Sequence, residues 1–199
     1  KSYCSDQGFK VSELAIQTYG GYGYCQEYPV EQYMRDLKIS SIYEGTNGIQ
    51  AMDLVFRKIL MDKGEKLKVF AGEVQALCQA VATTPLKDMA GALGAGLQAV
   101  VDSATHFGGL MAQGKEEEVR FMATDFQDQM GHVVLCYFLL KQAHVAQQAL
   151  DKGAEGDDKA YYEQKIVTTR YAFEDILPVA IAALNLLKRD QISGLQASF

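Results

Sequence analysis

A single carboxylate, Glu44, lies in the segment Tyr43–Thr46 between two expected helices. Ile39 and Ile42 precede it, so apolar side chains could enclose it. A carboxylate in an apolar pocket has a raised pKa, because desolvation disfavours its charged form, and it can then act as a general base. Gly45 would let a ligand approach the backbone closely, and the amides that begin the next helix favour negative charge. The segment therefore indicates a site of proton abstraction.

A simpler interpretation of these residues stays open at this level. A glutamate before glycine in a turn is most often a solvated side chain. Gly20-Gly21-Tyr22-Gly23 has a similar alternative, because a run of glycines stops a helix. It follows a helix rather than a strand, so it lacks the context of a dinucleotide-binding motif. Local features alone do not decide between these interpretations and a functional site.

Four motifs follow one another in the first part of the chain: QxxGGxG from Gln17, EYPVE from Glu27, MRD from Met34 and IYEGTxxIQ from Ile42. In this order and at these distances they resemble the acyl-CoA dehydrogenase family, over residues 1–62. The form YEGTNGIQAMDLV, followed by further helical sequence, is similar to a subgroup with a carboxy-terminal extension, which includes 3-methylmercaptopropionyl-CoA dehydrogenases. The resemblance implies a carboxy-terminal fragment of a longer enzyme.

The resemblance also implies roles for the residues of the Glu44 segment. Glu44 matches the base that removes a proton from the carbon next to a thioester carbonyl, while hydride passes to a flavin and a trans-2-enoyl-CoA forms. The Glu44 backbone N–H matches one donor to the carbonyl oxygen, where negative charge develops. Tyr43 and Gly45 flank this base and are expected to contact the substrate. The base needs a dry site, because the carbon acid is weak.

The expected cofactor is FAD, bound by the full-length parent, because FAD supplies the hydride chemistry. Thr46 matches a residue at the phosphates of the flavin cofactor, and Gln17, Gly20 and Gly21 match positions that touch the FAD of a neighbouring subunit. Family members often carry Glu or Gln where this chain has Gly48, which cannot make that side chain's contact. Arg35 and Asp36, in the MRD motif, are expected to be structural, as an ion pair or cap under the catalytic loop.

The partners implied by the family are an acyl-CoA substrate, an electron-transfer flavoprotein and a second copy of the chain, in a homodimer or a dimer of dimers. The amino-terminal helical domain and the β-domain of the family are not recognisable in these residues. We therefore expect the chain alone to bind FAD poorly and to lack dehydrogenase activity. The alternative function is a non-catalytic helical module for oligomerisation or interaction.

The elements that must position these residues are expected to be helices throughout, so the fold class is all-α. Three prolines in 199 residues and abundant Ala, Leu, Gln, Lys and Glu favour helices. Thr46 or Asn47 can cap the helix after the Glu44 segment. Pro178 is expected to kink the last helix. Helices are expected from the first residues to Tyr19 and over 30–39, 51–61, 66–82, 86–113, 116–150 and 157–189.

Short loops join the four long helices between residues 66 and 190, which predicts neighbours that run up and down and bury their apolar stripes in a four-helix bundle. We accordingly expect two domains. Residues 1–62 form the end of the catalytic helical domain, and residues 63–199 form an appended bundle.

The composition excludes several classes of partner. The formal net charge of −6 gives no general affinity for nucleic acid or an anionic membrane, and polar residues interrupt the least polar stretch, residues 89–111, so no membrane span is expected. Four scattered cysteines without a CxxC pair suggest free thiols in a reducing compartment, and hence the cytoplasm.

Two further groups of side chains have plain structural interpretations. Asp125, Asp128 and His132 share a helix face, but no Glu-x-x-His pair accompanies them, so we expect a polar face rather than a metal site. The aromatic residues of the last helix, Tyr161, Tyr162, Tyr171 and Phe173, are expected in a core or a subunit interface.

Overall fold

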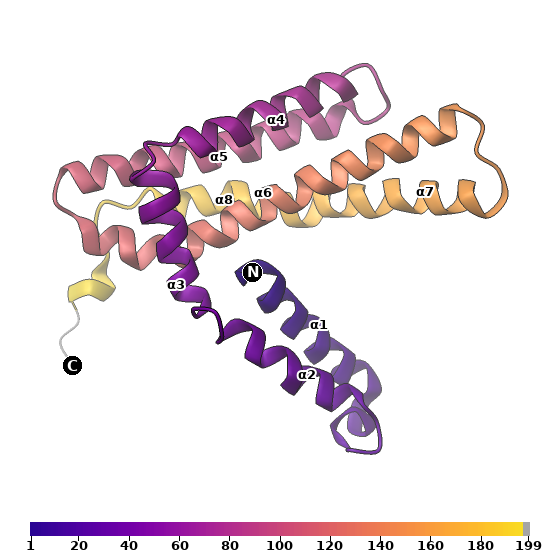
Figure 1. The fold of residues 1–199 in the computed structure, drawn as a ribbon, viewed down its shortest axis with the longest axis horizontal. Helices are drawn as coiled ribbons and strands as arrows, with labels where there is room; N and C mark the ends of the chain where they lie inside the picture. Colours follow the sequence, from indigo (N-terminus) through magenta and orange to yellow (C-terminus); the bar gives the residue numbers. More distant parts are fainter. Residues whose placement is uncertain (197–199) are drawn as a thin grey trace. The chain divides into compact units, whose positions relative to one another are not determined.

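The computed structural model describes residues 1–196, and the regular elements in that part of the chain are all helices (Figure 1). Short 3-10 helices cover Gly20–Tyr24, Ile39–Ser41 and Ser193–Gln196, and π-helical segments cover Asp53–Leu60 and Ala172–Ile176. The α-helices are α1 Ser2–Tyr19, α2 Val30–Lys38, α3 Asn47–Met52, α4 Glu65–Val81, α5 Lys87–Ala112, α6 Glu116–Asp151, α7 Gly156–Tyr171 and α8 Leu177–Leu187. The prediction of an all-α fold is confirmed.

The helices stop at the breaks that the sequence indicates. Helix α1 ends at Gly20, whose φ of 62° lies in the left-handed region. Lys63 and Gly64 separate α4 from the preceding segment, with φ values of 54° and 76°. Glycine adopts such angles at no steric cost, because it has no Cβ.

The predicted last long helix is interrupted near Pro178, and the kink expected there stays a prediction. Pro178 has no backbone N–H, and its ring would clash with the carbonyl four residues earlier in a regular helix. The chain widens into a π-helix over Ala172–Ile176 just before this proline, which divides the predicted helix into α7 and α8. The Ala172 carbonyl accepts a hydrogen bond from the thiol of Cys136 at 3.7 Å.

The chain divides into two compact units, and the first of them comprises Lys1–Leu54. In this unit α1 packs against α2. Gly8 allows a close approach, since a Cβ there would lie 3.6 Å from Leu37 Cδ2. The buried residues of α1 are small serines, Ser2, Ser5 and Ser12, so these contacts are close but bury little apolar surface.

The second unit begins at Val55. Its helix α4 packs on α5, α5 packs on α6 and α8, and α6 packs on α7 and α8. From α4 to α7 consecutive helices run antiparallel, and α8 continues in the direction of α7 (Figure 1). With 36 residues, α6 is about 54 Å long at 1.5 Å per residue. The assignment of these helices to an up-down four-helix bundle stays a prediction.

Large side chains fill the core of the second unit, and one glycine is essential to its packing. The fully buried side chains include Leu86, Leu93, Phe107, Leu110, Met122, Phe126, Leu140, Leu177 and Leu187. A Cβ at Gly96 of α5 would lie 2.8 Å from Leu177 Cδ1 of α8 and 3.3 Å from Val133 Cγ2 of α6. Glycine is therefore the residue that lets three helices meet at this point.

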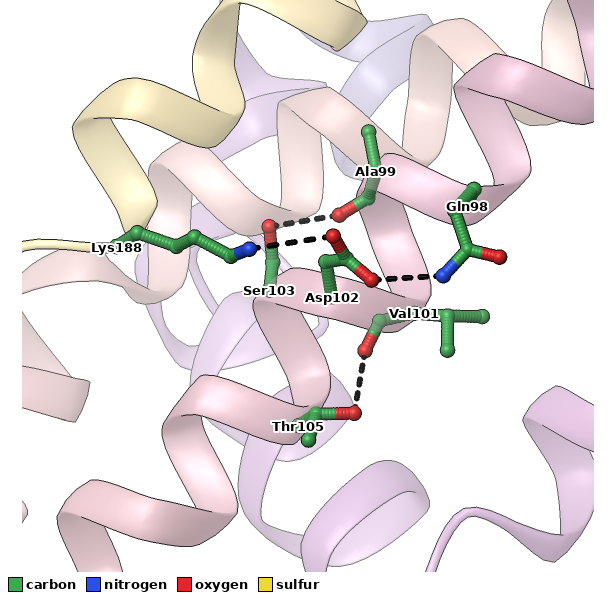
Figure 2. Close-up of polar contacts among 7 residues, drawn as sticks. All are labelled: Gln98, Ala99, Val101, Asp102, Ser103, Thr105 and Lys188. Atoms are coloured by element: carbon green, nitrogen blue, oxygen red, sulfur yellow. Dashed lines mark hydrogen bonds and ion pairs between the residues drawn. The ribbon is translucent and has the colours of Figure 1, made fainter.

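A polar contact joins α5 to the end of α8 at the surface of this unit (Figure 2). Asp102 accepts hydrogen bonds from Gln98 Nε2 at 2.7 Å and from Lys188 Nζ at 3.2 Å. The bond from Gln98, followed by that from Lys188, lowers the pKa of the Asp102 carboxyl below its usual value.

Candidate active site

The Glu44 segment is a tight reversal of the chain. Glu44 has a φ of 56° and Gly45 a φ of 80°, so two consecutive residues adopt the left-handed conformation. That conformation costs a residue with a side chain roughly 1–2 kcal/mol, while glycine adopts it freely. Neighbouring contacts must therefore hold Glu44 in place. One of them is a hydrogen bond of 2.7 Å from Gln50 Nε2 to the Glu44 carbonyl.

A polar cluster ties this reversal to the beginning of α1. Asn47 Nδ2 donates to Ser5 Oγ at 2.9 Å and to Asp6 Oδ1 at 2.8 Å. Lys1 Nζ donates to the Gly45 carbonyl at 3.0 Å and to Asn47 Oδ1 at 2.7 Å. The cluster links Gly45 and Asn47, which follow Glu44, to the beginning of α1.

The helix after the segment begins at Asn47, four residues before the predicted range of 51–61. Thr46 occupies the N-cap position, but its side chain makes no capping hydrogen bond. Asn47 uses its amide on α1 instead of on its own helix. The sequence identified Asn47 as a possible cap but missed its contacts with α1, because partners more than forty residues away leave no local pattern.

The side chains around Glu44 are open to solvent. Tyr43, Glu44, Gly45 and Thr46 are all exposed. The apolar neighbours expected to enclose the carboxylate are also more than half exposed, with Ile42 at 51% and Tyr43 at 52%. The expectation that these neighbours form an apolar pocket is wrong for the described residues, since they lie on the surface. An apolar environment for Glu44 would require groups beyond them.

The glycines at the other end of α1 have different structural roles. A Cβ at Gly23 would lie 2.5 Å from the Ile16 carbonyl oxygen, so packing requires glycine there. Gly20 is required by its φ of 62°. Gly21 has neither constraint, because its φ is not positive and no described atom lies within 4 Å of a Cβ built on it. Gln17, Gly20 and Gly21 are exposed.

The structure thus brings the predicted site residues into two groups. The segment Tyr43–Thr46 is tied to the beginning of α1, near Ser5 and Asp6. Gln17, Gly20 and Gly21 lie at the end of the same helix. The rise of an α-helix places these ends about 20 Å apart. One copy of the chain therefore presents two separate surfaces rather than one site.

The two charged residues of the MRD motif make contacts within their own helix. Arg35 Nε pairs with Glu31 Oε2 at 3.1 Å, one turn earlier on α2. Asp36 Oδ2 accepts a bond of 3.5 Å from Gln32 Nε2. The expected ion pair of Arg35 is present, but both of its members belong to α2, so it stabilises that helix.

Two other groups of side chains were considered from the sequence, the polar group around Asp125 and the aromatic residues of the last predicted helix. No cluster of three or more metal-ligating side chains occurs among residues 1–196. Burial raises the pKa of the Asp125 carboxyl, with Arg189 opposing that shift. Within the aromatic group, Phe173 is buried, Tyr162 is half-buried, and Tyr161 and Tyr171 are exposed. No helix in the described part of the chain is long and apolar enough to span a bilayer.

The described residues thus form an all-α protein with a glutamate in a strained loop between helices. Two family descriptions match the chain. "Acyl-CoA dehydrogenase, C-terminal domain" covers residues 1–59, and "Acetyl-CoA dehydrogenase C-terminal like" covers residues 70–196. The chain belongs to the acyl-CoA dehydrogenase family, and its residues match the carboxy-terminal parts of that family.

Individual relatives agree with this assignment. The broad-specificity linear acyl-CoA dehydrogenase FadE5 of Mycobacterium tuberculosis is 34% identical over 194 residues, which are 94% of this chain and 32% of the relative. A butyryl-CoA dehydrogenase of Syntrophomonas wolfei is 30% identical over 94% of this chain and 31% of its own length. The 3-methylmercaptopropionyl-CoA dehydrogenase of Ruegeria pomeroyi is 42% identical over 38% of this chain and 13% of its own length. The chain spans about a third of the length of the first two relatives.

Proposed function

We propose that this chain contributes the catalytic base, Glu44, to an FAD-dependent acyl-CoA dehydrogenase that converts an acyl-CoA thioester to a trans-2-enoyl-CoA. The observation that supports this role most directly is the backbone of Glu44. A left-handed conformation at a residue with a side chain is costly, and such strain is concentrated at functional sites. The contacts of Gln50 and Lys1 hold the strained segment in one geometry.

The residues of the segment would divide the chemistry between them. The Glu44 carboxylate takes the proton from the carbon next to the thioester carbonyl. The Glu44 backbone N–H donates a hydrogen bond to the carbonyl oxygen, where negative charge develops in the transition state. Tyr43 and Gly45 contact the substrate on either side. Bound FAD supplies the acceptor for the hydride that leaves the neighbouring carbon.

The proposed contact of this chain with FAD rests on Gly21, which lies just after α1 and has space around it. Gly21 leaves space for an outside group, and the chain's own packing does not require glycine there. Thr46 has an exposed side chain with no capping role. Because Gly21 and Glu44 lie at opposite ends of α1, we propose that Gln17, Gly20 and Gly21 contact the FAD of a second copy, while Thr46 contacts the FAD beside Glu44.

The same proposal includes the assembly around the site. We propose a homodimer or dimer of dimers, reoxidation by an electron-transfer flavoprotein, and a cytoplasmic location. We also propose a catalytic part over residues 1–62 and an appended helical part over residues 63–199. The isolated chain would bind FAD poorly and would not turn over, because its Glu44 segment is exposed.

The base assignment is tested by Glu44→Gln in a full-length protein that carries these residues. Removal of a general base lowers kcat by about 10²–10⁴-fold, while the flavin absorbance of the purified variant stays unchanged. The matched control is Glu13→Gln, an exposed carboxylate on α1, which keeps full activity. Full activity in Glu44→Gln would refute the assignment.

Two further measurements test the cofactor contact and the inactivity of the isolated chain. Gly21→Ala in the full-length protein should lose FAD more readily during dialysis while its helix content is unchanged, since the chain itself has space for the methyl group. The 199-residue chain should show no turnover with FAD, an acyl-CoA and an artificial electron acceptor. Turnover by the chain alone would contradict the proposal.

A further inference from the structure

A long groove lies between α4 and α5 in the second unit, and nothing in the proposed function uses it. Its volume is about 830 Å³. The buried residues Leu67 and Val74 of α4 and Leu97 of α5 lie along it. The two helices run side by side and antiparallel (Figure 1), and Cys78 Sγ of α4 contacts the Ala90 carbonyl of α5 at 3.4 Å. The groove therefore follows the helix pair over several turns.

The lining residues recur at the spacing of a helical seam. On the α4 side, Leu67 and Val74 lie seven residues apart, and so do Ala71 and Cys78. The α5 side repeats the same interval in two interleaved series, Ala90, Leu97 and Ala104, and Gly94, Val101 and Gly108. A seven-residue repeat with alternating steps of three and four is the pattern with which one α-helix packs its side chains into another.

Two glycines of the groove have no role in the packing of the chain itself. A Cβ at Gly94 or at Gly108 would meet no described atom within 4 Å, whereas one at Gly96 would collide with Leu177. Glycine inside a helix costs about 1 kcal/mol relative to alanine. Gly94 and Gly108 therefore weaken α5 without any gain in core packing. They provide space for a backbone to approach α5 closely.

The lining of the groove carries positive charge at one end and has few polar groups that need an outside partner elsewhere. Lys63 and Lys68 line it, and the described lining includes no carboxylate. The Lys68 ammonium is already paired with the Glu65 carboxylate at 2.6 Å, so Lys63 carries the charge that an occupant would meet. The polar residues of the α5 side make hydrogen bonds within their own helix (Figure 2). Gln98 donates to Asp102 at 2.7 Å, and Thr105 donates to the Val101 carbonyl at 2.8 Å. An occupant would therefore be mostly apolar, with negative charge at the lysine end.

We propose that this groove binds an amphipathic helix of a partner protein. The helix presents an apolar seam at three-four spacing to the groove and places carboxylates at the end where Lys63 lies. A second copy offering the same face is a poorer fit, because two concave surfaces leave a void between them. A small molecule is also a poorer fit, because ligand pockets enclose most of the ligand's surface, whereas this groove is an open furrow between two helices.

The experiment measures the binding of a labelled probe peptide to the 199-residue chain by fluorescence anisotropy. The probe is a helical peptide of about three heptads, with leucine at the seam positions, alanine and glutamine elsewhere, and two glutamates at one end. Gly94→Leu and Gly108→Leu fill the groove. Their matched controls are Gly91→Leu and Gly109→Leu, because those glycines are exposed on the same helix, equally free of neighbours within 4 Å of a Cβ, and outside the groove.

Saturable binding of the probe is expected. Gly94→Leu and Gly108→Leu should weaken it at least about tenfold, which corresponds to 1.4 kcal/mol, while both controls change it less than about twofold. Thermal unfolding followed by circular dichroism establishes that all four variants are folded. A probe with lysines in place of its glutamates should bind more weakly to the native chain, and Lys63→Glu should restore its binding.

Three outcomes would overturn the proposal. The first is no saturable binding of the probe, or binding that Gly94→Leu and Gly108→Leu leave unchanged. The second is a dimer of the chain in light scattering that Gly94→Leu converts to a monomer, which would assign the groove to a second copy. The third is displacement of the probe by palmitate at equimolar concentration, which would assign it to acyl chains. A failure of Glu44 as the base would leave these results unaffected, since they use only the second unit.

Discussion

The two compact units of this chain differ in how many large apolar side chains they bury. In the second unit, large side chains such as Phe126 and Leu140 are completely buried. In the first unit, Val11 and Leu14 of α1 are 65% and 63% exposed. Burial of apolar surface is the main source of folding free energy, so the second unit supplies its own stability. The first unit leaves apolar surface exposed, which fits our proposal that groups outside it complete the site.

The largest expected effect tests this contrast directly. Phe126→Ala should lower the free energy of unfolding by about 3–5 kcal/mol, because the ring is fully buried and its centroid lies 5.4 Å from that of Phe107. Leu14→Ala in the first unit should change it by less than about 0.5 kcal/mol. Urea unfolding followed by circular dichroism measures both. Equal losses would show that α1 is covered in the chain as it stands.

A smaller effect separates two glycines on one helix. Gly96→Ala should destabilise the second unit by about 1–3 kcal/mol, because its methyl group would collide with Leu177. Gly94→Ala should stabilise it by about 1 kcal/mol through helix propensity, since its methyl group meets open space. Thermal unfolding of the two variants gives the comparison. A loss of stability in Gly94→Ala would mean that the groove is occupied in the isolated chain.

A third effect concerns the strain in the first unit. Glu44→Gly should stabilise this unit by about 1 kcal/mol, because glycine adopts the left-handed conformation without cost. Gly45→Ala should destabilise it by a similar amount, since its φ is 80° and a Cβ would lie 3.2 Å from Gln50 Nε2. Hydrogen exchange of the amides in α1–α3 measures both changes. Faster amide hydrogen exchange in Glu44→Gly than in the native chain would show that the left-handed conformation of Glu44 is not strained.

The smallest effect concerns the surface contact of Asp102 with Gln98 and Lys188 (Figure 2). These contacts lower the folded-state pKa of Asp102 below its ordinary value of 3.8. Their stabilisation is therefore complete above that value and is lost as the pH falls through the lower, folded-state pKa. Asp102→Asn should cost less than about 1 kcal/mol at pH 7, and the difference should vanish in strong acid. Asp88→Asn, at an exposed position on α5, serves as the control in pH-dependent urea unfolding.

The placement of helices could be predicted from local sequence with small errors. The breaks at Gly20, at Lys63-Gly64 and before Gly156 follow from backbone angles that glycine tolerates best, so they are visible in the residues themselves. The interruption of the last predicted helix near Pro178 follows from the missing N–H of proline. The π-helical form of this interruption, over Ala172–Ile176, was not predicted.

The Glu44 segment could be identified from the order of its motifs, but its geometry could not. The left-handed angle of Glu44 and the link from Asn47 to Ser5 and Asp6 depend on contacts between residues far apart in the chain. The exposure of Ile42 and Tyr43 could not be predicted either. The sequence does not show whether another group covers an apolar residue that precedes a carboxylate.

The sequence by itself determined the family of this protein, its helical class and the identity of its candidate base, because residue types, spacing and motif order carry that information. Only the tertiary structure decided which apolar residues form a core, which glycines are needed for packing, and which two helices leave a groove open. Those properties belong to pairs of distant residues, and burial is a property of what surrounds a side chain rather than of the side chain itself.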